Sequence, residues 1–156
     1  MPDFKPRDLD FENRIKTVFA SQTAMASMHI NLIAVLPGHI KMTLDKTPQL
    51  LQQQGFIHGG VISSALDSAC GFAALSLSAP ATEVLSIEFK TSFLLPASTD
   101  RLYIEGEVLK SGRRVSFCQS KAYDSTGEDR KLVAMMTSSL AHVDMPADWI
   151  AGTSVR

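Results

Sequence analysis

The chain has 156 residues, of which 45% are hydrophobic and 20% are charged, and its formal net charge is −1. This length and composition fit one globular domain with a substantial core, and they exclude disordered, collagen-like and coiled-coil proteins. The near-neutral charge gives no general attraction to nucleic acid or to anionic membranes. Cys70 and Cys118 have neither CxxC nor Cys/His spacing, so we expect neither a zinc site nor a disulfide framework.

The N-terminal stretch MPDFKPRDLDFENR is charged and contains prolines, so it does not resemble a signal peptide. The strongly apolar runs are shorter than the roughly 20 residues that a membrane helix needs. We therefore expect a cytoplasmic protein whose partners include neither a membrane nor nucleic acid.

Residues 10–27 form the first predicted element. Side chains that are mostly apolar recur there at helical spacing, and Asp10 stands where an N-cap would. One amphipathic helix is expected over this range. The positions on that spacing are Phe11, Ile15, Val18, Phe19, Gln22 and Met25.

From Met28 the pattern changes to that of strands. The segment MHINLIAVLPGHIKMTLD predicts two strands joined by a hairpin at Pro37-Gly38, and the polar residues 46–56 predict a loop. An apolar helix is expected from about Gly59 to Leu77.

The remainder up to residue 143 predicts strands. Between Leu85 and Phe93, apolar and polar residues alternate with the two-residue period of a half-buried strand. A second hairpin is expected at Ser111-Gly112, and the turn STGED leads into a last strand. This order of elements predicts an α+β domain with a meandering antiparallel sheet.

The chain divides into three predicted parts. They are an N-terminal helical extension (1–27), a main domain (28–144) and a C-terminal tail (145–156), in which Trp149 suggests that the tail docks on the domain. The central helix is apolar on most sides, so it must be covered by the sheet and by something else. Because the sheet edges would also stay open in a monomer, we expect an oligomer.

The stretch GFIHGGVISSALDSACGFAALSLSA, residues 55–79, holds the main candidates for a functional site. His58, Gly59 and Gly60 stand at the start of the predicted helix, where backbone N–H groups lack intrahelical partners and the helix dipole is positive. Glycine leaves those groups accessible, so this start can bind an anion or a carbonyl oxygen under attack. The alternative is that the glycines only permit a tight turn into the helix.

Asp67 is the single acid in this apolar stretch. It is either a solvated acid on a polar stripe of the helix or a catalytic carboxylate. The eight positions between Gly59 and Asp67 span about 12 Å of helix at ~1.5 Å per residue. One carbonyl cannot contact both groups, because hydrogen-bonded contacts are roughly 3 Å long. Either the two groups are unrelated, or an antiparallel second copy brings its own Asp67 to Gly59.

Three motifs together resemble the hotdog-fold acyl-CoA thioesterases of the phenylacetate-pathway (PaaI) type. They are GFIHGGVISSALDSACGFAA, VLSIEFKTSFLLPA and GEVLKSGRRVSF, and the resemblance runs from about residue 28 to 143. It implies an antiparallel sheet wrapped around a long central helix, homodimers, and often tetramers built as dimers of dimers. The implied reaction hydrolyses an acyl-CoA to a free acid and coenzyme A, without a cofactor apart from the coenzyme A of the substrate.

The resemblance also implies roles for individual residues. The catalytic carboxylate falls on Asp67, as general base or nucleophile, and the amide that polarises the thioester carbonyl falls on Gly59, in the loop ending with His58. A hydroxyl that helps to position water falls on Ser86.

Two further roles depend on the same resemblance. Where the family usually has an asparagine six residues before the histidine, this chain has Gln52, and Gln53 could supply the amide instead. Basic residues that bind coenzyme A in the family correspond to Arg113 and Arg114 beside the second hairpin. Because charge is common at hairpins, these arginines could equally be solvated.

Other functions remain open for the same residues. His58 could act as a general base, as in the hotdog-fold acyl-thioester dehydratases and hydratases, which combine a histidine with an acid from the partner subunit. A non-catalytic acyl-CoA-binding module would merely tolerate Asp67. Cys70 lies one turn from Asp67, but a small buried cysteine is more typical of packing than of a nucleophile. No metal is expected, because the remaining histidines show no ligand spacing; these are His29, His39 and His142.

Overall fold

The structure is a computed structural model that describes residues 4–144. The predicted tail 145–156, including Trp149, lies outside the described residues. In chain order the elements are α1 (Phe11–Ser21), α2 (Thr23–Ser27), β1 (Ile30–Leu36), β2 (His39–Asp45), a short 3₁₀ helix (Pro48–Leu50), α3 (Gly59–Leu75), β3 (Thr82–Phe93), β4 (Arg101–Ser111), β5 (Val115–Tyr123) and β6 (Leu132–Asp144).

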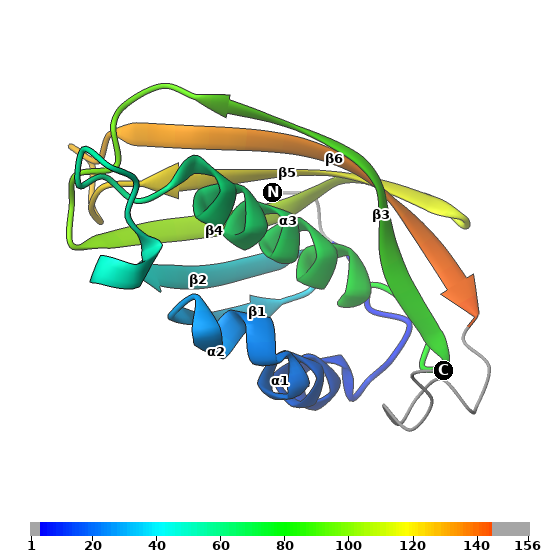
Figure 1. Cartoon of the computed structure of the whole chain (residues 1–156). Coiled ribbons are helices and arrows are strands. Elements are labelled where there is room, and N and C mark those ends of the chain that lie inside the picture. Colours follow the sequence, from blue (N-terminus) through cyan, green and yellow to red (C-terminus); the bar gives the residue numbers. More distant parts are fainter. Residues whose placement is uncertain (1–3, 145–156) are drawn as a thin grey trace.

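A single six-stranded sheet has the order β1-β2-β4-β5-β6-β3, and every neighbouring pair is antiparallel. The sheet curves around α3, which lies along its inner face (Figure 1). The predicted α+β architecture with a central helix and both predicted hairpins is therefore confirmed. None of the described helices is long and apolar enough to cross a membrane.

The N-terminal extension is helical, but it is not the single helix predicted over 10–27. Gln22 has an extended backbone (φ −80°, ψ 94°) and separates α1 from α2. The Asp10 side chain does not cap α1; it accepts a hydrogen bond from Asn13 Nδ2 at 2.7 Å instead. Both helices pack on the domain, since Ile15 of α1 and Met25 of α2 are buried.

The contact between α3 and the sheet is made by small residues. Ala65, Ala69 and Ala73 recur every four residues, which places them on one face of the helix, and all three are fully buried. Opposite them, Gly106 of β4 lies so close that an added Cβ would be 2.4 Å from the Ala69 carbonyl oxygen. The helix can lie this close to β4 only because position 106 carries no side chain.

Strand β3 leaves the order of the chain and forms the edge of the sheet beside β6. Its register shifts between Ser86 and Glu88, so Ile87 is an extra residue. Because directly paired residues share a face, Ser86 lies on the inner face with its partner Leu140. Beyond the bulge, Phe89 pairs with Ser138 on this same face, whereas a strict two-residue alternation along β3 would place Ser86 and Phe89 on opposite faces.

The same strand is apolar but uncovered in a single chain. Ile87, Phe89 and Phe93 expose 59%, 50% and 54% of their surface, and the far side of β3 has no neighbouring strand within the described residues. Long exposed apolar edges are templates for pairing with another chain. This edge therefore gives the expected oligomer a specific location.

The glycines at 71 and 106 predict opposite responses to the same substitution. Gly106→Ala should lower the free energy of unfolding by several kcal/mol, because its Cβ would overlap the backbone of Ala69. Gly71→Ala should raise the free energy of unfolding by about 0.5–1 kcal/mol, because Gly71 is inside α3 and its Cβ would meet nothing within 4 Å. Urea unfolding of both variants beside the wild type measures the two changes. Equal effects would contradict this account of the helix–sheet contact.

Candidate active site

The start of α3 is held by His58. Its Nδ1 accepts a hydrogen bond from the Gly60 N–H at 2.9 Å, and its carbonyl oxygen accepts from Val61 and Ile62 at 3.0 and 3.2 Å. Within residues 4–144 the Gly59 N–H has no hydrogen-bond partner. Three of the first four amides of the helix are thus occupied, and Gly59 presents the one that is free to bind an oxygen.

The loop before the helix shapes a pocket around this free amide. Gly55 has a positive φ of 83° and closes a tight turn, in which the Gln52 side chain bonds to Gln54. A cavity of about 420 Å³ lies between this loop and the end of β3, and Gln52, Gly59 and Phe93 line it. Of the two glutamines expected to supply an amide, Gln52 lines the cavity and Gln53 does not.

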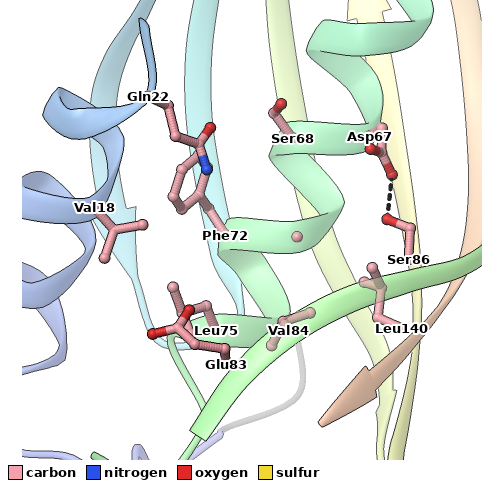
Figure 2. Close-up of a pocket in the computed structure, with 11 residues that line it drawn as sticks. Val18, Gln22, Asp67, Ser68, Phe72, Leu75, Glu83, Val84, Ser86 and Leu140 are labelled. Atoms are coloured by element: carbon pink, nitrogen blue, oxygen red, sulfur yellow. Dashed lines mark hydrogen bonds between the residues drawn. The ribbon is translucent and has the colours of Figure 1, made fainter. Parts of the chain in front are cut away.

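Asp67 lies on the opposite side of α3 from the buried alanines. Ser86 Oγ donates a hydrogen bond to Asp67 Oδ1 at 2.7 Å, across the gap between the helix and β3 (Figure 2). Burial raises the pKa of the Asp67 carboxyl, and the hydrogen bond from Ser86 partly opposes this shift. A carboxylate with a raised pKa beside a pocket is suited to proton transfer or nucleophilic attack.

A second cavity, of about 230 Å³, adjoins this acid. It lies between α1, α3 and the start of β3, and Figure 2 shows Val18 of α1 and Gln22, the residue after α1, on the side away from Ser86. The sequence pattern did not indicate these two residues as part of a site, because residues 1–27 have the pattern of an extension outside the main domain. The one feature of the sequence that indicated a space beside the acid was Gly71, a glycine four residues after Asp67 in the predicted helix.

The two half-sites remain apart within one chain. Gly59 and Gln52 line the cavity at the start of α3, Asp67 and Ser86 line the cavity further along it, and the two linings share no residue. This separation agrees with the spacing along the helix, which places Gly59 and Asp67 about 12 Å apart. No single chain brings the predicted amide and the predicted acid to one substrate atom.

Arg113 and Arg114 are exposed at the turn between β4 and β5. They line a cavity of about 650 Å³ together with Arg7 and His142. Within the described part of the chain, neither residue of this pair forms a salt bridge. The arginines are thus available to an anion, and Arg7 adds a cation that the sequence did not suggest.

Both cysteines are buried and unbonded. Burial raises the pKa of the Cys70 thiol to about 12, and the pKa of Cys118 is raised as well. A thiol with so high a pKa supplies almost no thiolate at neutral pH, so Cys70 is a packing residue. Residues 4–144 contain no group of three metal-binding side chains.

Comparison with known proteins points to one superfamily. The family model of the thioesterase superfamily matches residues 54–131, which include Gly59, Asp67, Ser86 and the arginine pair. A thioesterase family protein of Silicibacter pomeroyi, of known structure, is 35% identical to this chain with a TM-score of 0.83; the match covers 86% of this chain and 99% of that one.

Two more distant structures have the same fold. The Escherichia coli PaaI protein of the phenylacetic acid degradation operon has a TM-score of 0.77 at 18% identity, over 86% of this chain and 94% of that one. A thioesterase of Haemophilus influenzae has a TM-score of 0.76 at 18% identity, over 88% and 92% of the two chains. The predicted hotdog fold of PaaI type is confirmed.

The raised pKa of Asp67 predicts a stability effect. When an acid has a higher pKa in the folded than in the unfolded state, the free energy of unfolding of the protein falls as the pH rises from the unfolded pKa through the folded pKa. Asp67→Asn should therefore be more stable than the wild type at pH 7, because the amide can still accept from Ser86 and carries no buried charge. The difference should vanish below pH ~3, which is below the pKa of aspartate in both states.

Thermal unfolding between about pH 2.5 and pH 8 measures this difference. Asp129→Asn, at an exposed position, is the matched control and should leave the unfolding temperature nearly unchanged across the range. A destabilised Asp67→Asn protein at pH 7 would contradict the burial effect.

Proposed function

Since the chain belongs to the thioesterase superfamily and is a thioester hydrolase, we propose that it hydrolyses acyl-CoA at sites built from two subunits. The observation that carries this proposal is the hydrogen bond between Ser86 and Asp67, 2.7 Å long, at the edge of a cavity. It gives a partly buried acid a fixed orientation toward a space where a substrate can sit. A free helix-start amide at Gly59 supplies the complementary group.

The proposed chemistry divides between the two half-sites. Attack on the thioester places negative charge on the carbonyl oxygen, and a preorganised N–H such as that of Gly59 stabilises the charge by about 3 kcal/mol. Asp67 either takes a proton from an attacking water molecule, or attacks the carbonyl carbon itself to form a mixed anhydride that water then hydrolyses. In both routes the C–S bond breaks, the acyl group leaves as the free acid, and coenzyme A leaves as its thiol. Ser86 orients the carboxylate or the water. Gln52 orients the thioester from the side of the amide. His58 is assigned a positioning role, because its Nδ1 already caps the helix.

A second subunit is proposed to join the half-sites. The exposed edge of β3 is apolar and unpaired, so two copies related by a two-fold axis can continue the sheet through β3. That axis would set the two α3 helices antiparallel, with Gly59 of one copy opposite Asp67 of the other. A homodimer then has two composite sites, and a dimer of dimers is the further assembly we propose.

Coenzyme A carries phosphates, and the arginines at the β4–β5 turn are proposed to bind them. Arg113 and Arg114 make no salt bridge within the described residues, and Arg7 lines the same cavity. A location in the cytoplasm, where acyl-CoA is available, completes the proposal.

Release of free thiol from a panel of acyl-CoAs tests the reaction. Asp67→Ala should lower kcat by about 10²–10⁴-fold with the dimer intact, and Ser86→Ala should lower it less, because it removes only an orienting contact. Exposed Ser98, changed to alanine, is the matched control for Ser86. A change in enoyl absorbance without thiol release would indicate a dehydratase, and tight binding without turnover would indicate a binding module.

The composite site has its own test. Gly59→Val should abolish activity, because its Cβ alone would lie 3.1 Å from the Phe93 ring, so the side chain would crowd the cavity that Gly59 and Phe93 line. Mixing inactive Asp67→Ala subunits with inactive Gly59→Val subunits should restore activity, since each mixed dimer keeps one site in which both groups are native. Native mass spectrometry verifies that subunits exchange. No recovery after verified exchange would show that each site lies within one chain.

A further inference from the structure

The free N–H of Gly59 has an aromatic neighbour from a distant strand. A Cβ added at Gly59 would lie 3.1, 3.3 and 3.6 Å from the three carbons at the far end of the Phe93 ring. The ring thus occupies the place that the side chain of residue 59 would take. We infer that Phe93 is a positioning residue for thioester hydrolysis, whose ring shields the Gly59 N–H from water on one side. This inference rests on the proposed function, because it takes that N–H as the group that binds the thioester carbonyl.

The end of β3 is tied to the start of α3 on both sides of this ring. Ser63 Oγ of α3 donates a hydrogen bond to Thr91 Oγ1 at 3.3 Å, two residues before Phe93. The Ile57 N–H, just before α3, donates to the Ala97 carbonyl oxygen at 3.1 Å, beyond the end of β3. Because the chain on either side of Phe93 is bonded to residues that flank the helix start, the surrounding structure holds the ring against Gly59.

Packing in the core does not account for the ring. Phe93 exposes 54% of its surface, and it lines the cavity of about 420 Å³ together with Gly59 and Gln52. The ring therefore presents apolar surface both to the Gly59 backbone and to the cavity in which the thioester is proposed to lie.

Shielding matters because water competes for a free N–H and screens charge. An apolar ring beside the N–H removes water from one side and lowers the local dielectric constant, so a hydrogen bond to a charged oxygen becomes stronger. This gain is larger for the oxyanion of the transition state than for the neutral carbonyl of the bound substrate. Phe93 should therefore affect kcat more than KM, although it forms and breaks no bond in the reaction.

Kinetics of acyl-CoA hydrolysis tests the shielding. Phe93→Ala should lower kcat by ~10-fold or more and change KM by less than about threefold. Phe93→Leu keeps an apolar side chain, so its kcat should lie between those of the wild type and Phe93→Ala. Phe117→Ala, at another exposed phenylalanine, is the matched control and should leave kcat within about twofold.

The S-methyl thioether of coenzyme A distinguishes shielding from simple contact with the substrate, because it has no carbonyl oxygen. Calorimetry should give affinities for the wild type and Phe93→Ala that agree within about twofold. A loss of affinity as large as the loss of kcat/KM would show that the ring only contacts the substrate, and it would overturn the inference. An unchanged kcat would do the same, and so would a Phe93→Ala protein that loses the oligomeric state of the wild type on size-exclusion chromatography.

Nuclear magnetic resonance separates this inference from the proposed reaction. If no thioester is hydrolysed, the proposed function fails, and line broadening by a soluble gadolinium chelate still measures how closely solvent approaches the Gly59 N–H. The reference is Gly127, an exposed glycine between β5 and β6. In the wild type, Gly59 should broaden less than Gly127, and Phe93→Ala should raise the broadening at Gly59 while leaving that at Gly127 unchanged. Equal broadening of the two glycines in the wild type, or no change at Gly59 in the variant, would refute the shielding.

Discussion

The close contact of α3 with β4 is the constraint from which the rest of the molecule follows. Position 106 must be glycine for the Ala69 backbone to lie against the strand. The alanines of α3 that face the sheet keep the distance between the helix and the sheet short along the whole contact. A helix this close to the sheet has a defined rotation as well as a defined position. Side chains two residues along the helix point ~200° away, so Asp67 faces outward because Ala69 faces the sheet.

That rotation explains how one helix serves both the core and the site. The alanine face makes apolar contact with the sheet through small side chains. The opposite face carries Asp67 and Gly71, where an added Cβ would meet nothing within 4 Å. The β3 bulge then turns Ser86 toward the helix, where its hydroxyl reaches Asp67. Burial of the carboxyl and its single fixed donor act on the pKa in opposite directions, and burial is the larger effect. The site acid is therefore positioned by the packing that stabilises the fold.

The sequence predicted what depends on local pattern. The central helix, both hairpins and the separation of Gly59 from Asp67 follow from periodicity, turn residues and helical rise, and the structure agrees with each. The features it could not predict depend on contacts between distant segments. The inward direction of Ser86 requires the register shift against β6, and α1 becomes a cavity wall only through contacts such as that of Arg14 with Thr82. The role of His58 as a helix cap is local, but periodicity does not distinguish a cap from a base.

A single chain is incomplete in two respects, and the same partner subunit would complete both. Strand β3 ends the sheet with apolar side chains exposed, and the two groups proposed to act on the thioester, Gly59 and Asp67, line separate cavities along α3. A partner paired along β3 would cover the exposed apolar edge. The same pairing would place a second α3 antiparallel to the first, so that Gly59 of one subunit would lie opposite Asp67 of the other. The hydrophobic effect that favours association would then also bring a free amide to an oriented acid. In such an arrangement an isolated subunit lacks a complete site, so turnover depends on assembly.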